Sequence, residues 1–248
     1  MSSDSAPINL TNHFLIAMPG LSDELFGQSV VFLCEHTERG ALGLIINKPS
    51  DIRLHDLFEK VDLPLRRPEL AEAPVFRGGP LQTERGFVLH DALGEPSAVG
   101  ADETPPAVAR ALREATEAAR AEETRRQTED PEAGSEAGQD GAGEDEPPEP
   151  ISIYASTLRI PGGLEMTTSR DVLEAISSGA GPHRVLVTLG YSSWGEGQLE
   201  SEITENSWLT VAADPAVIFD TPVEKRYAKA MALLGLEPWM LSRDAGHA

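Results

Sequence analysis

The chain has 248 residues, of which 40% are hydrophobic and 25% charged, so it is long and apolar enough for one globular domain with a sizeable core. Its net charge of −21 argues against direct nucleic-acid binding, which depends on Lys and Arg displacing counterions from phosphates. The single cysteine, Cys34, excludes an intrachain disulfide and favours a cytoplasmic location, and we expect no membrane association because no apolar run reaches the ~20 residues of a membrane helix.

Two apolar, β-branched runs near the N-terminus predict buried neighbouring strands. They are Ser29 to Glu35 and Ala41 to Asn47, separated by HTERG, which is typical of a hairpin. The stretch Asn47 to Asp51 (NKPSD) is predicted to break the sheet. A short helix then follows, with an apolar face formed by Leu54, Leu57, Phe58 and Val61. Pro74 to Arg77 and Gly86 to His90 are predicted as two further strands around the turn GGPLQTER.

Residues 92–150 interrupt this regular pattern. They contain sixteen Asp or Glu and five Arg, a net charge of −11, so the remainder of the chain carries −10. The stretch 121–150 has no bulky apolar side chain and cannot bury enough area to offset its ordering entropy. We therefore predict an acidic, disordered insertion at about 92–150, with a weakly docked helix in its first half. Either the insertion is a tolerated loop without a function of its own, or it binds a partner.

The second half of the chain mixes strands and helices. A helix is expected at Arg170 to Ser178, ended by Gly179, and Arg184 to Leu189 (RVLVTL) is expected to be a central strand. A glycine-hinged turn is predicted through Gly190 to Gly195 (GYSSWG), before a helix that starts near Gln198. Because the strands and helices do not alternate strictly, the pattern favours an α+β fold over a doubly wound sheet.

The last predicted helix has the clearest boundary signals. Thr221 is a suitable N-cap, Pro222 suits the first helical position, Glu224 would complete a capping box, and Gly235 would end the helix in a left-handed conformation. Its apolar face is expected to consist of Val223, Tyr227, Ala230, Met231 and Leu234.

No motif with an established chemistry is present. The sequence has no glycine-rich dinucleotide or nucleotide loop, no HExxH and no paired cysteines, and its six histidines are not at ligand spacing on one element. GYSSWG is not a nucleophile elbow, because GxSxG requires its second glycine two residues after the serine. We therefore predict no cofactor, no metal site and no catalytic residues.

Cys34 carries one chemical hypothesis. Alternation along a strand would place Cys34 and His36 on one face, where a thiolate beside an imidazole can act as a nucleophile or a redox group. An enzyme would use Cys34, His36 or His90 together with Glu200. The alternative is that Cys34 is a small core residue, as free cysteines in apolar strands usually are.

A second candidate surface lies at glycine-rich turns. The backbone N–H groups of Gly78 and Gly79 can face an anion, although a tight turn explains the same residues. Trp194 would be a partly exposed anchor or a core lid, framed by Gly197 and Gln198 in a groove. Glu200 and Glu202, in the first turns of the following helix, are predicted to form a solvated face rather than an acid–base pair.

The chain resembles the AlgH/YqgE family in segments that occur in order over nearly all of both halves. These are Met18-Pro-Gly with Asp23 and Phe26; SVVFLCEHTERGALGLIINKP; PVFRGGPLQTERGFVLHD; LEMTTSRDVLEAI; VLVTLGYSSWGEGQLESEI; the region Asn206-Ser-Trp208; Ile218-Phe-Asp; and Gly246-His-Ala. The family pattern is expected to skip the first few residues and 92–150.

The resemblance implies a single domain and an α+β fold whose mixed, strongly bent sheet forms a pseudo-barrel with flanking helices. It brings no agreed catalytic residues. Members are often labelled transcriptional regulators, but no helix-turn-helix is legible here and the charge has the wrong sign. We therefore favour a non-enzymatic binding or regulatory protein with a protein or small-molecule partner. A thiol-dependent or hydrolytic enzyme and a nucleic-acid-associated regulator are the alternatives.

Overall fold

The computed structural model describes residues 9–92 and 153–236, so all but the first residue of the predicted insertion lies outside the described residues. The elements in chain order are β1 (His13–Ala17), β2 (Val30–Thr37), β3 (Gly40–Ile45), β4 (Pro49–Arg53), α1 (Leu54–Lys60), η1 (Pro68–Leu70), β5 (Pro74–Arg77), β6 (Leu81–Asp91), β7 (Thr157–Ile160), β8 (Leu164–Thr167), α3 (Arg170–Ser178), β9 (Val185–Trp194), α4 (Gln198–Thr204), β10 (Trp208–Ala212), α5 (Pro215–Phe219), η2 (Val223–Lys225) and α6 (Arg226–Leu233).

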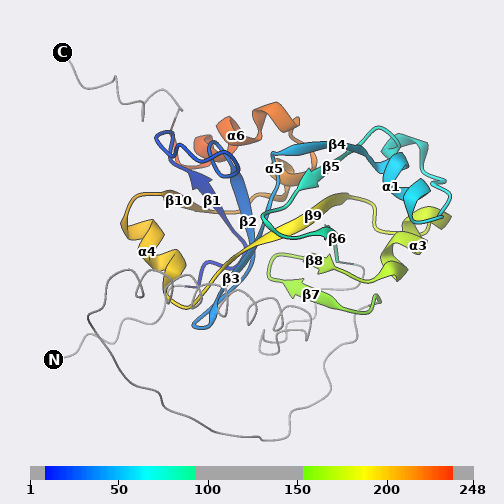
Figure 1. Ribbon diagram of the computed structural model, residues 1–248, viewed down its shortest axis with the longest axis horizontal. Helices are drawn as coiled ribbons and strands as arrows, with labels where there is room; N and C mark the ends of the chain where they lie inside the picture. The colour runs from blue at the N-terminus through cyan, green and yellow to red at the C-terminus, as the bar shows by residue number, and fades with distance from the viewer. Residues whose placement is uncertain (1–8, 93–152, 237–248) are drawn as a thin grey trace, which may run out of the picture.

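The strands form one strongly curled sheet with helices around it, as Figure 1 shows. Its order is β10-β1-β2-β3-β9-β6-β8-β7 with antiparallel neighbours, while β5 lies parallel to β9 and antiparallel to β4. The curl is strong enough for Leu158 of β7 to share a core with Phe32 of β2. The predicted α+β class, with a mixed and strongly bent sheet forming a barrel-like core, is confirmed.

Strand β9 lies at the centre of this arrangement and runs further than the sequence predicted. Its first half pairs with β5 and β6, and its second half pairs with β3. Gly190 separates the two halves at a positive φ of 74°, which a glycine adopts without strain. The turn predicted for Gly190 to Gly195 is wrong, because Ser192 to Trp194 continue the strand and pair with Gly43 to Ala41.

The predicted hairpin is confirmed as β2 and β3, which pair in antiparallel register. The predicted break at NKPSD is wrong, because Pro49–Arg53 form strand β4 against β5. A proline is tolerated there since β4 has a strand neighbour on one side only among the described residues. The helix predicted after this stretch is α1, with Leu54 and Phe58 buried.

The ends of the helices follow the sequence signals unevenly. α3 ends at Gly179 as predicted, with a left-handed φ of 84°, and Gly235 follows α6 with the predicted left-handed conformation, at a φ of 71°. The predicted cap at Thr221 is wrong, because its hydroxyl donates to the carbonyl oxygen of Ala216 in α5 at 2.9 Å. Glu224 therefore completes no capping box, and a 3-10 turn, η2, precedes α6.

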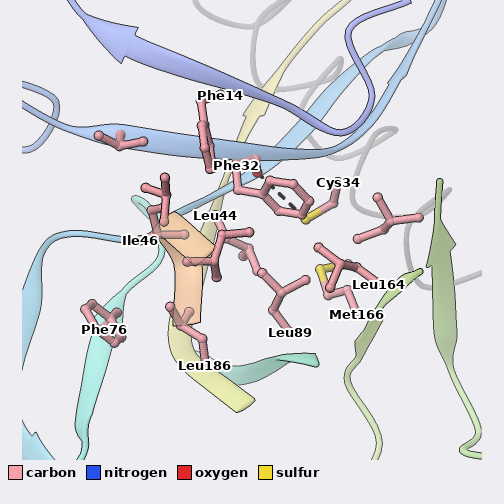
Figure 2. Close-up of a cluster of buried hydrophobic side chains, with 14 of the residues drawn as sticks. Phe14, Phe32, Cys34, Leu44, Ile46, Phe76, Leu89, Leu164, Met166 and Leu186 are labelled. Carbon is pink, nitrogen blue, oxygen red and sulfur yellow. Dashed lines mark hydrogen bonds between the residues drawn. The ribbon is translucent and has the colours of Figure 1, made fainter. Parts of the chain in front are cut away.

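Three apolar clusters hold these elements together. The first fills the inside of the curled sheet, as Figure 2 shows, and α5 and α6 close it at one end. The second lies outside β1 to β3 under α4, and the third lies between α1, α3 and the outer side of β6 and β9. Because both faces of the sheet are covered, strands such as β2 and β3 are almost continuously apolar instead of alternating.

Candidate functional site

The structure separates Cys34, His36 and His90 from one another, and of the three only His36 meets Glu200. Cys34 belongs to the cluster inside the sheet, and His36 contacts α4 on the outside. His90 packs against Tyr154 beside the third cluster, with ring centroids 5.7 Å apart. The three side chains therefore lie in three different environments.

Cys34 and His36 do not share a face, and the prediction that they do is wrong. The pairing of β2 with β3 shifts at Cys34, since Leu33 is opposite Gly43 while Glu35 is opposite Leu42. A bulge of this kind adds one residue and interrupts the alternation of side chains. In Figure 2 Cys34 lies among the inner apolar side chains, and its burial raises the pKa of the thiol far above the ordinary value.

His36 forms an ordered pair with Glu200. Its Nε2 lies 2.8 Å from Glu200 Oε1, and its Nδ1 accepts the backbone N–H of Leu10 at 2.9 Å. Because Nδ1 is the acceptor, the neutral ring carries its proton on Nε2 and donates it to the carboxylate. A general base needs the nitrogen opposite the carboxylate, and the Leu10 amide already occupies that nitrogen. The pair therefore anchors the N-terminal segment to α4.

His90 is fully buried and its ring is hydrogen-bonded on both sides. Nδ1 lies 2.8 Å from the carbonyl oxygen of Asp91, and Nε2 lies 2.9 Å from Thr167 Oγ1. Thr167 Oγ1 is in turn 2.7 Å from Thr157 Oγ1. Burial lowers the pKa of His90, so the ring is neutral. The bonded chain orients the imidazole within the fold.

Gly78 and Gly79 are buried where the end of β5 crosses β9. A Cβ at Gly78 would lie 2.2 Å from the carbonyl oxygen of Gly190, and one at Gly79 would lie 2.2 Å from the backbone of Tyr191. The Gly78 amide donates to Leu189 O at 2.9 Å. These glycines permit a close crossing of two backbones and do not form the open anion cradle considered from the sequence.

Trp194 is only 3% exposed and acts as a lid on the second apolar cluster. Its indole N–H and that of Trp208 donate to the same Glu202 oxygen, Oε2, at 2.9 and 2.8 Å. Gln198 donates to the other oxygen, Oε1, at 3.0 Å. Glu202 thus joins two strands to α4, so the predicted solvated face is wrong for Glu202, whereas Glu200 is exposed as predicted.

The exposed part of this region is polar. Gly197 takes a left-handed φ of 70° just before α4, and Gln198 and Glu200 are exposed on the first turn of that helix. The side chain of Trp194 is buried in the cluster under α4, and that of Tyr191 is buried in the cluster inside the sheet. Trp194 therefore offers no exposed anchor on this surface.

A cleft that was not predicted from the sequence lies where α5 and α6 approach β5 and the start of β9. It has a volume of about 250 Å³, and apolar side chains line it, among them Phe76, Leu186, Ile218 and Phe219. Arg226 is the charged residue of its wall. We call it the Arg226 cleft.

Arg226 is 6% exposed and is held by neutral groups. Its Nε donates to Thr221 O at 3.1 Å, its Nη1 donates to Ile46 O, and its Cζ lies 4.9 Å from the centre of the Phe76 ring. Burial lowers the pKa of the guanidinium to about 10, so it stays charged at neutral pH.

The neighbouring Arg184, unlike Arg226, is paired with carboxylates. Its Nη2 lies 2.7 Å from Asp91 Oδ1, and its Nη1 lies 3.6 Å from Asp220 Oδ2. The pKa of Arg184 is raised, chiefly by the hydrogen bond to Asp91, whereas for Arg226 burial alone shifts the pKa. Arg226 is thus a buried cation without a carboxylate partner in the described part of the chain.

One sequence signal could have found this cleft. Arg226 lies three residues after Val223 and four before Ala230, so it falls on the face predicted to be apolar. A charged residue at such a position requires a specific environment, because burying an unpaired charge is costly.

Within residues 9–92 and 153–236, no group of three or more His, Cys, Asp or Glu is placed to hold a metal ion. No helix in these ranges is long and apolar enough to cross a membrane.

Comparison with known proteins places these features in a family context. A family model described as AlgH-like matches residues 14–130 and 144–239, so the match breaks only at 131–143, a shorter stretch than the 92–150 we expected it to skip. UPF0301 proteins of Paracidovorax citrulli and a Polaromonas species are 62% and 58% identical over 248 residues, covering 100% of each chain.

Two solved structures are similar. The solution structure of the AlgH protein from Pseudomonas aeruginosa is 37% identical with a TM-score of 0.60, and 100% of both chains is covered. The crystal structure of the DIP2367 protein from Corynebacterium diphtheriae has a TM-score of 0.54 at 18% identity, covering 92% of this chain and 88% of that one, a likeness in fold alone.

Proposed function

This chain belongs to the AlgH-like family, and we propose that it works as a non-enzymatic binding protein whose small-molecule ligand occupies the Arg226 cleft. The observation that carries the proposal is the buried guanidinium of Arg226 in an otherwise apolar wall. Ligand sites are commonly apolar concavities with a few well-placed polar groups. The cleft has this composition.

The arrangement of the reactive side chains supports binding over catalysis. A thiol enzyme needs its cysteine within hydrogen-bond reach of a base. Cys34 lies inside the sheet with a raised pKa, while His36 is fully bonded on the outside. His90 is neutral and bonded at both nitrogens. None of these groups lines the Arg226 cleft.

Two further features belong to the proposal. We propose a cytoplasmic location, supported by the single cysteine, since proteins of oxidising compartments commonly use disulfides. We also propose that an acidic insertion at about 92–150 interrupts one domain, supported by the composition of that stretch and by the break in the family match at 131–143. The family match covers the rest of that stretch, 92–130 and 144–150.

The test is a binding measurement with three probes that share a phenyl ring and a two-carbon arm. Phenylacetate, phenylacetamide and phenethylamine are titrated into the full chain, and methyl NMR signals of Leu186, Val187 and Ile218, all in the cleft, are followed. Specific, saturable shifts with at least one probe, and recovery of that probe unchanged, support the proposal.

A pair of variants locates the binding. Ala73→Phe places a large side chain in the cleft and should abolish the shifts, because Ala73 lies in its wall. Ala212→Phe makes the same change at an exposed position of β10 and should leave binding intact. Absence of shifts with all three probes, or binding that Ala73→Phe leaves unchanged, would overturn the cleft as the binding site.

A further inference from the structure

Resting on the proposed function, we infer that the Arg226 cleft selects a small monocarboxylate, with the carboxylate on the Arg226 guanidinium and a compact apolar body against Leu186, Ile218 and Phe219. The selection for a carboxylate, for one charge and for a compact body each follows from a separate feature of the cleft.

Charge selects the head group. The chain is strongly acidic at −21, yet the hydrogen bonds of Arg226 to described residues run to two carbonyl oxygens and to no carboxylate. Carbonyl dipoles satisfy donors without neutralising the charge, and a buried charge is stable only when it is compensated. An anion in the cleft would supply the missing compensation.

Geometry favours a carboxylate among anions. A guanidinium has five N–H donors in a planar fork that matches the two oxygens of a carboxylate. The carbonyl oxygens of Thr221 and Ile46 accept hydrogen bonds from Nε and Nη1. The guanidinium carbon, Cζ, lies 4.9 Å from the centre of the Phe76 ring. These three contacts hold the fork in place, so little side-chain entropy is lost when a ligand binds.

The apolar wall limits the ligand to one charge. Apart from Arg226, the residues lining the cleft are aliphatic, aromatic, alanine or proline. A second carboxylate would be desolvated against these side chains without a partner. Dicarboxylates are therefore expected to bind less tightly than monocarboxylates of similar size.

The volume limits the body of the ligand. An apolar cavity of about 150 Å³ is large enough to bind benzene. The Arg226 cleft, at about 250 Å³, has room for a ring or short alkyl chain of that size together with a short arm and a carboxylate. Phenylacetate has these dimensions and serves as the probe.

The decisive comparison uses the unaltered full chain. Phenylacetate is expected to bind at least about tenfold more tightly than phenylacetamide, because hydrogen bonds from a charged donor to a charged acceptor exceed those to a neutral one. It is also expected to bind at least about tenfold more tightly than phenylmalonate, which adds a second carboxylate. Calorimetry and the methyl NMR titration both report these dissociation constants.

Arg226→Gln is expected to weaken phenylacetate binding much more than phenylacetamide binding, so that the roughly tenfold preference for phenylacetate is lost. Arg226→Lys keeps the charge and should keep part of the preference. Far-UV circular dichroism establishes that each variant folds, and if Arg226→Gln does not, the ligand comparison on the unaltered chain still decides.

The outcomes separate this inference from the proposed function. If phenylacetamide or phenylmalonate binds in the cleft as tightly as phenylacetate, the carboxylate selection is wrong while the binding role stands. If no probe binds, the proposed function itself fails. A preference for phenylacetate that Arg226→Gln leaves intact would assign the selection to another residue and overturn the inference.

Discussion

Replacing Glu202 by alanine should destabilise the protein substantially although Glu202 is itself partly exposed. One carboxylate oxygen accepts both Trp194 and Trp208, whose side chains are 3% and 4% exposed. Hydrogen bonds to a charged group each contribute about 1.5–3 kcal/mol. We take the lower end for both bonds because water can reach the site. The free energy of unfolding is then expected to fall by about 3 kcal/mol. For a chain of this size that lowers the Tm by roughly 6–12 °C.

Urea unfolding followed by tryptophan fluorescence measures this loss, since two of the three tryptophans of the chain lie at the site. Glu202→Gln keeps one oxygen that can accept from the two indoles, but its new NH₂ group faces the NH₂ group of Gln198. It should therefore lower the free energy of unfolding by only about 1 kcal/mol. Glu196→Ala makes the same charge change at an exposed position nearby and should stay within about 0.5 kcal/mol. If Glu202→Ala costs no more than Glu196→Ala, the carboxylate does not hold the two indoles.

Three further predictions follow from buried groups. A thiol reagent should react with native Cys34 at least about 100-fold more slowly than with the urea-unfolded chain, and equal rates would contradict its burial. The lowered pKa of His90 means that its contribution to stability is complete above its ordinary value of 6.5 and declines below it. The difference in unfolding free energy between wild type and His90→Gln should thus shrink from about pH 7.5 to about pH 5.5, whereas a constant difference would exclude this linkage. Gly78→Ala should cost at least about 2 kcal/mol in urea unfolding because its Cβ meets Gly190, while Gly86→Ala, with nothing within 4 Å, should be nearly neutral; similar costs would refute the close crossing.

The sequence predicted local structure well where the signal was local. The structure contains the predicted strands β2 and β3, the helix at Arg170–Ser178 that ends at Gly179, and the left-handed Gly235. Each depends on side-chain composition or on the conformational freedom of one residue. The cap at Thr221 failed because its hydroxyl bonds to Ala216 of the preceding helix.

The candidate site was harder to predict because its parts depend on pairings across the chain. The bulge in β2 places the side chains of Cys34 and His36 on opposite faces of the sheet. Its position depends on how β2 pairs with β3. The role of Glu202 was missed because its partners, Trp194 and Trp208, lie on β9 and β10 and not on its own helix. The partner of Glu200, His36, lies 164 residues away in the chain.

The sequence by itself determined the fold class, the family resemblance and the absence of familiar catalytic and nucleotide motifs, since these are written in composition, order and spacing. Only the tertiary structure decided which polar groups meet. The Arg226 cleft combines residues from β5, β9, α5 and α6. The physical reason is that hydrogen bonds and burial act between neighbours in space, and the curl of the sheet sets those neighbours.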